Sequence, residues 1–134
     1  MFRCVLITAL GLSCAVSAGA QALAQQPFLK RNFPATALRG DIQFLNPPQI
    51  ELNGKPTQLS PGSRIRSVNN MLVLSGSLTG QQTKVHYTLD DLSQQVKDVW
   101  ILRPEEAAVN PWPRTLLEAQ TWRFDTLSQR WTKP

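Results

Sequence analysis

The sequence has few of the residues on which enzymes and metal sites depend. Of its 134 residues one is a histidine and two are cysteines, and both cysteines, Cys4 and Cys14, lie near the N-terminus. Zinc sites need three or four ligands from His, Cys, Asp and Glu, and a serine triad needs its histidine beside a serine and an acid. Because His86 stands alone and no G-x-S-x-G motif occurs, we expect no enzyme, no metal site and no cofactor.

Two pairs of neighbouring acids are the remaining candidates for catalysis, because paired carboxylates can hydrolyse glycosides. Asp90-Asp91 falls in an expected hairpin loop, where such residues ordinarily form turns. Glu105-Glu106 follows a proline at the start of an expected helical turn, where acids stabilise the positive end of the helix dipole. Structural roles therefore explain both pairs.

Clusters of positive charge are also lacking. Lysine and arginine exceed the acids by 14 to 9, and they are scattered along the chain. Nucleic-acid-binding domains usually cluster their cations among aromatic residues, so we expect no nucleic-acid partner. A mild positive excess does allow contact with anionic envelope polymers or lipid headgroups.

Residues 1–24 have the pattern of a cleavable export signal. Arg3 precedes an almost uncharged run from Cys4 to Val16, and small residues lead to an A-x-A site ending at Ala24. The run is shorter than the roughly 20 apolar residues of a membrane-spanning helix. Cleavage after Ala24 removes both cysteines, and 134 residues less these 24 leave 110. We expect these to form a periplasmic domain with neither a disulfide nor a transmembrane anchor.

Two other forms of processing are the alternatives. One is cleavage after Ala20, and the other is cleavage before Cys14 with lipidation of that cysteine. A lipidated cysteine usually follows a leucine three positions earlier, where this chain has Gly11. The pattern therefore favours the cut after Ala24.

We expect residues 25–38 to form a flexible leader and residues 39–134 to form a single β-rich domain. Short alternating segments separated by Gly, Pro and Asn turns predict an all-β fold, a small antiparallel barrel or sandwich of five to seven short strands. Four apolar residues in a row, Met71 to Leu74, predict a strand covered on both faces.

Asn53-Gly54 is the clearest turn signal in the chain. It lies between two alternating segments and predicts a two-residue hairpin with a type I′ turn. In that register Leu52 pairs with Lys55, and Pro56 lies opposite Glu51. Because Pro56 lacks an N–H, it should lie at an edge or a bulge.

The C-terminal third predicts a short helical turn at 103–108, a brief helix at 115–120 and a Trp-rich hairpin from 121–125 and 130–132. We expect the aromatics of this hairpin to cover an open end of the barrel. Trp112, Trp122 and Trp131 are candidate partner-binding residues, because tryptophan is enriched at interface hot spots. Core packing is the alternative role for these rings.

Arg64, Arg66, Lys84 and His86 are the candidate anion-binding residues. They project from one outward face if their two strands are neighbours, and such a face can hold phosphate, an acidic glycan or an acidic partner. The alternative is a set of separate, solvated charges. In either case we expect His86 to lie at the surface.

Several short motifs resemble those of an uncharacterised group of small exported proteins of beta-proteobacteria. They are Leu52-Asn53-Gly54, Leu59-Ser60-Pro61-Gly62, Arg64-Ile65-Arg66, Asn69-Asn70-Met71-Leu72, Val99-Trp100-Ile101-Leu102 and Trp122-Arg123-Phe124-Asp125. The resemblance covers nearly the whole chain after the export signal. It implies a periplasmic location and no particular activity. Exported bacterial OB-fold proteins of similar size are comparable in architecture only.

These observations favour an exported, non-enzymatic module for protein–protein interaction or envelope assembly. Its partner would be another envelope protein, held through the Pro56 edge or the aromatic C-terminal segment. The alternative is a binder of anionic ligands through the Arg/Lys face. The oligomeric state does not follow from the sequence.

Overall fold

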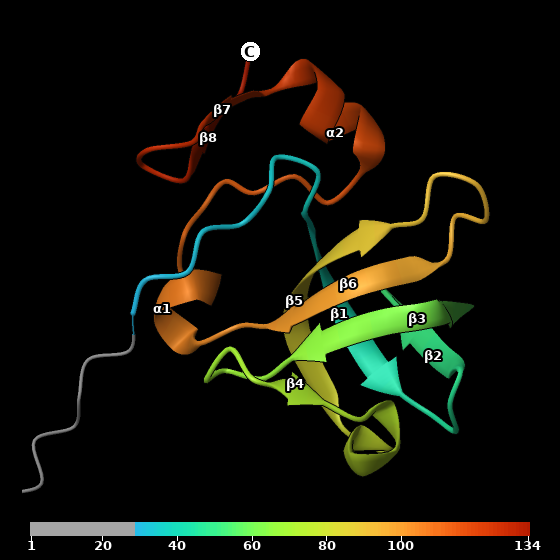
Figure 1. Cartoon of the computed structure of the whole chain (residues 1–134). Coiled ribbons are helices and arrows are strands. Elements are labelled where there is room, and N and C mark those ends of the chain that lie inside the picture. The colour runs from blue at the N-terminus through green and yellow to red at the C-terminus, as the bar shows by residue number, and fades with distance from the viewer. Residues whose placement is uncertain (1–28) are drawn as a thin grey trace, which may run out of the picture.

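The computed structural model describes residues 29–134, and the expected export signal lies outside this range. Six strands form the main sheet: β1 (Leu38–Phe44), β2 (Gln49–Leu52), β3 (Lys55–Arg66), β4 (Leu72–Val73), β5 (Gln82–Leu89) and β6 (Val96–Ile101). The other elements are the 3-10 helix η1 (Ser75–Leu78), the helices α1 (Pro104–Ala107) and α2 (Leu116–Thr121), and the hairpin of β7 (Arg123–Asp125) and β8 (Arg130–Thr132) (Figure 1). None of these helices is long and apolar enough to cross a membrane.

The main sheet closes into a five-stranded barrel. Its order is β2-β1-β5-β6-β3-β4, and a further pairing of β2 with β3 joins the ends of the wall. The pairs are antiparallel except for β3 with β6, which run parallel. The expected all-β barrel is therefore confirmed, and its closure resembles that of OB-type Greek-key barrels. β4 lies outside the closed ring and pairs with β3.

The β2–β3 hairpin has the register that the sequence predicts. Asn53 and Gly54 both adopt positive φ, 53° and 79°, as a type I′ turn requires. Leu52 pairs with Lys55, and Glu51 lies opposite Pro56. β3 then shifts register against β6 between Leu59 and Arg64, so the strand bends after the proline segment.

Alternate residues of the strands fill the barrel with aliphatic side chains. The buried interior consists of Leu38, Ile42, Phe44, Ile50, Leu59, Ile65, Val85, Tyr87, Val96 and Val99. Gly40 is on the same face of β1, and a Cβ atom there would lie 2.8 Å from Cε1 of Tyr87. Glycine at this position therefore leaves room for the tyrosine ring.

The expectation of a buried strand at Met71–Leu74 is wrong. β4 contains only Leu72 and Val73, and Met71, Leu72 and Leu74 are exposed. The reason is topological: β2 and β3 already close the barrel, so β4 is an outer edge strand. Only Val73 packs against the barrel core.

The segment from residue 29 to 37 is packed against the domain, so the expectation of a flexible leader fails over this range. Arg31 and Phe33 are buried, and the N–H of Phe33 donates to Oε1 of Gln129 at 2.7 Å. Phe33 belongs to a second apolar cluster with Ala37, Leu102, Trp112 and Trp131. The leader thus contributes to the core of the C-terminal third.

The two short helices and the terminal hairpin occur where the sequence predicts them. Their aromatics, however, cover the outer wall of the barrel. Trp112 stacks on the ring of His86, whose neighbours Val85 and Tyr87 point into the barrel. Because side chains alternate along a strand, His86 points outward, and the C-terminal third covers the β5 side of the wall (Figure 1).

Candidate functional site

A row of side chains crosses the outer face of the sheet at one level. The strand registers place Arg39 opposite His86, His86 opposite Trp100, Trp100 opposite Arg66, and Arg66 opposite Leu72. Paired residues share one face of a sheet. Arg39 and His86 are buried at one end of the row, Trp100 and Arg66 are half-buried, and Leu72 is exposed.

The four expected anion-binding residues do not form one cluster. β6 lies between β3 and β5, so the arginines and Lys84 are not neighbours. Arg64 stands opposite Asp98 and Lys84 stands opposite Asp41, and such pairs lower the local charge. Of the four residues, Arg66 alone lines a cleft between residues 29–32 and the β3–β4 turn.

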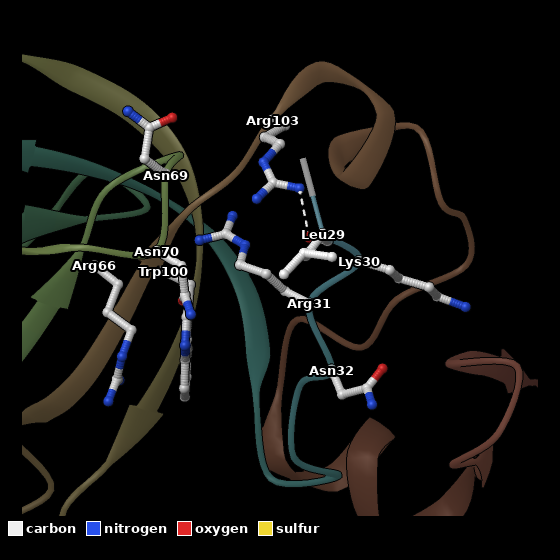
Figure 2. Close-up of a pocket in the computed structure, with 9 residues that line it drawn as sticks. All are labelled: Leu29, Lys30, Arg31, Asn32, Arg66, Asn69, Asn70, Trp100 and Arg103. Carbon is white, nitrogen blue, oxygen red and sulfur yellow. Dashed lines mark hydrogen bonds between the residues drawn. The ribbon is translucent and has the colours of Figure 1, made fainter. Parts of the chain in front are cut away.

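This cleft, which we call the cationic cleft, has a volume of about 680 Å³ and lies between residues 29–32 and the β3–β4 turn (Figure 2). Four of its nine lining residues are cations and none is an acid. The cations are Lys30, Arg31, Arg66 and Arg103. Asn69, Asn70 and Trp100 supply polar and aromatic surface.

Arg31 and Arg103 form the rigid wall of the cationic cleft. Arg31 donates to Glu106 and to the carbonyl oxygens of Ser67 and Ile101. Arg103 donates to the carbonyl oxygens of Val68 and Leu29 and lies 3.6 Å from the Glu106 carboxylate. Two buried guanidinium groups therefore share one carboxylate, and the wall keeps a net positive charge.

Glu106 remains ionised in this setting. Burial alone would raise the pKa of its carboxyl, but the hydrogen bonds from Arg31 and from the backbone N–H of Arg103, with both guanidinium charges, hold the pKa below its ordinary value. Glu106 also occupies the third position of α1, where its side chain accepts from the backbone of the N-cap residue. The expected structural role of this acid is confirmed.

Arg66, like the exposed Lys30, is a cation of the cleft that is available to a ligand. Its guanidinium carbon lies 5.8 Å from the centre of the Trp100 ring, and Figure 2 shows the two side chains extending side by side. No hydrogen bond or ion pair joins its side chain to another residue of the range 29–134. Its N–H donors are therefore free for a ligand while the ring restricts its position.

A second cavity, of about 290 Å³, lies behind the wall and shares Lys30, Arg31 and Arg103 with the cationic cleft. His86 lines it and is 1% exposed, so the expectation of a surface histidine is wrong. The ring stacks on Trp112 with centroids 4.0 Å apart, and Phe33 meets it edge-on at 4.4 Å. The alternation of β5 assigns His86 to the outer face, but it carries no information on the distant segments that cover it.

His86 is neutral. Burial, followed by the charges of Arg39 and Arg31, lowers its pKa to about 2. An arginine N–H lies 3.2 Å from Nε2, and because arginine can only donate, Nε2 accepts and the proton is on Nδ1. Within the described residues, this buried Nδ1–H has no hydrogen-bond partner.

The candidate partner-binding tryptophans lie mainly in the second apolar cluster. Trp112 and Trp131 are each 5% exposed, and Nε1 of Trp112 donates to the carbonyl of Ala37 at 2.9 Å. Trp122 is half-buried, with the ammonium of Lys133 5.2 Å from its ring. The structure therefore shows the alternative role, core packing, for Trp112 and Trp131.

The remaining expected features concern acids and metal ligands. Asp90 accepts the backbone N–H groups of Leu92 and Ser93, which confirms its role in a turn and lowers the pKa of its carboxyl. In the range 29–134 no three His, Cys, Asp or Glu residues are grouped so that they could hold a metal ion.

Comparison of the chain with protein-family models, with curated proteins and with solved structures finds no significant match. The cationic cleft must therefore be interpreted from its own residues. Of these, Arg66 was a candidate from the sequence. Lys30, Arg31 and Arg103 were missed, because residues far apart in the chain form the cleft.

Proposed function

We propose that this chain is an exported, non-enzymatic domain that binds an anionic ligand in the cationic cleft. The observation that carries the proposal is the lining itself, which has four cations and no acid. An anion entering the cleft meets no like charge on its walls. Each charge-assisted hydrogen bond formed there is worth about 1.5–3 kcal/mol.

The geometry around Arg66 favours phosphate or carboxylate groups. The guanidinium has donors in a planar fork that matches two oxygens of such an anion. The neighbouring side-chain amides of Asn69 and Asn70 are exposed and also line the cleft. They can donate to further oxygens or to sugar hydroxyls.

The size of the cleft indicates a ligand larger than a single phosphate ion. Small-molecule sites usually measure about 300–1,000 Å³, and this cleft lies within that range. A phosphorylated or acidic component of the cell envelope has the appropriate size and charge. The periplasmic location remains part of the proposal.

An interaction or envelope-assembly module is the second candidate function. β4 pairs with β3 and forms the outer edge of the sheet. An edge strand can accept an extended segment of another protein by strand addition. The exposed apolar side chains of Met71, Leu72 and Leu74 adjoin that edge.

The first experiment measures binding of inorganic pyrophosphate and of citrate by calorimetry, using the protein recovered from the cells that express it. Arg66→Gln should weaken binding by about tenfold or more, since it removes at least one charge-assisted hydrogen bond. Raising the salt concentration should also weaken binding. The matched control is Arg64→Gln, two residues away on the same strand and opposite Asp98. If both variants lose affinity equally, general surface charge is responsible and the cleft is not the site.

A further inference from the structure

We propose that the anionic ligand is the headgroup layer of an anionic lipid bilayer, on which the domain docks through the cationic cleft and the β3–β4 hairpin. The inference rests on the proposed function and specifies its ligand. It depends on the juxtaposition of the cleft with exposed apolar side chains that the barrel fold leaves uncovered.

The β3–β4 hairpin places an apolar side chain beside the key cation. Arg66 and Leu72 are partners in the antiparallel register, so both project from the outer face of the sheet. The backbone of Leu74 is extended, with φ −79° and ψ 136°, and the alternation of side chains therefore continues. Leu72 and Leu74, 67% and 82% exposed, thus share the face that carries Arg66.

Exposed apolar residues are concentrated around the cleft. The described chain exposes nine large apolar side chains, and five of them belong to the cleft lining or to segment 68–74. These five are Leu29, Val68, Met71, Leu72 and Leu74. Single exposed apolar residues are ordinary, but a group of this kind marks an interaction surface.

The charge of the same region is complementary to an anionic surface. From residue 52 to residue 89 the sequence contains no aspartate or glutamate, and it includes Lys55, Arg64, Arg66 and Lys84. This acid-free stretch forms β3, β4, η1 and β5. Within this stretch the β3–β4 hairpin carries Arg66 beside the cleft and has no acid of its own, so an extended anionic plane can approach the hairpin and the cleft together, whereas a small soluble anion uses only the cleft.

Cations beside exposed leucine and methionine are the combination that interfacial membrane binding requires. The cations contact lipid phosphates, and the apolar side chains enter the boundary between headgroups and acyl chains. Each cation near an anionic membrane contributes roughly fivefold in affinity. A bilayer therefore accounts for both the charge and the apolar group, which a free phosphate does not.

The test measures co-sedimentation of the protein with phosphatidylcholine vesicles, with and without phosphatidylglycerol. We expect binding only to the anionic vesicles, and we expect the double variant Leu72→Gln/Leu74→Gln to reduce it by about tenfold or more. Both side chains are exposed, so these changes should leave the fold intact. The matched control is Leu92→Gln/Leu127→Gln, at 97% and 91% exposed positions outside the cleft lining.

The pyrophosphate measurement separates this inference from the proposed function. The Leu72/Leu74 variant should still bind pyrophosphate, because the cations of the cleft remain. If the unaltered protein binds pyrophosphate but no vesicle, the lipid surface is wrong and the anion site stands. Vesicle binding that the double variant retains would mean electrostatic adsorption only and would overturn the inference. If neither probe binds, both proposals fail.

Discussion

The neutral, buried His86 makes the stability of this domain depend on pH in a defined direction. An unfolded histidine titrates near pH 6.5, whereas burial and two neighbouring arginines lower the pKa of the folded residue to about 2. Between these values the unfolded chain binds a proton that the folded chain does not. Stability is therefore fully present above pH 6.5 and is lost as the pH falls.

The magnitude follows from linkage. Below pH 6.5, protonation of the histidine stabilises the unfolded state by 2.303RT for each pH unit. At pH 5.0, about 1.5 units lower, the free energy of unfolding should therefore be about 2 kcal/mol smaller than at pH 7.5. The result does not depend on how far below pH 4 the folded value lies. The lowered pKa values of Asp90, Glu106 and Asp125 add further loss mainly below pH 5.

Urea unfolding at a series of pH values from 7.5 to 5.0 measures this effect through the free energy of unfolding. His86 is the one histidine of the chain, so His86→Gln should remove most of the slope even if it lowers stability at pH 7.5. A wild-type curve that is flat, or that rises toward pH 5.0, would show that His86 is protonated or exposed in the folded protein. An unchanged slope in His86→Gln would refute the assignment.

Two further predictions concern the framework of the site. Glu106→Gln should lower the free energy of unfolding by about 3 kcal/mol, because it leaves Arg31 and Arg103 without their shared carboxylate; a loss below 1 kcal/mol in thermal or urea unfolding would contradict the arrangement. Gly40→Ala should cost about 1–3 kcal/mol, since its methyl group would lie 2.8 Å from the Tyr87 ring. The Gly40→Ala/Tyr87→Leu pair should recover part of that loss in a double-mutant cycle.

The parts of the fold that were predictable from the sequence are those set by neighbouring residues. Asn53-Gly54 fixes a type I′ turn through two positive φ values, and the register of the hairpin follows from it. Pro104 with Glu106 similarly specifies the short helix α1. In both cases the interacting groups lie within a few residues of each other, so the local sequence is sufficient to predict the structure.

The parts that were not predictable depend on what covers an outward face. The alternation of side chains along a strand assigns His86 and Leu72 to the outside of the barrel. It does not show whether another segment of the chain covers either residue. Trp112 covers the histidine, while nothing in the described chain buries the leucine. The packing of Arg31 beside Glu106, 75 positions away, has no local signal either.

One signal for the cationic cleft was present in the sequence and was missed. The count of 14 cations against 9 acids is mild when averaged over the chain, but no acid occurs from residue 52 to residue 89. The net charge of the whole chain conceals this acid-free stretch, because the acids lie before it, in β1 and β2, and after it, beyond β5. Arg66 lies in this acid-free stretch, so the pattern marks β3 and β4, but it gives no signal for the other three cations of the cleft, which lie outside it.

The row of side chains from Arg39 to Leu72 on the outer face of the sheet combines a buried histidine at one end with a cation available to a ligand near the other. At its buried end His86 is neutral, so its ring adds no charge beside Arg39 and Arg31. Next to its exposed end the half-buried Arg66 carries a charge that arginine keeps throughout the physiological pH range. The charge of the cleft is therefore independent of pH where the stability is not. For an anion whose own charge is constant over this range, such as sulfate, a loss of binding between pH 6.5 and 5.0 would consequently report loss of the folded state rather than a change in the site.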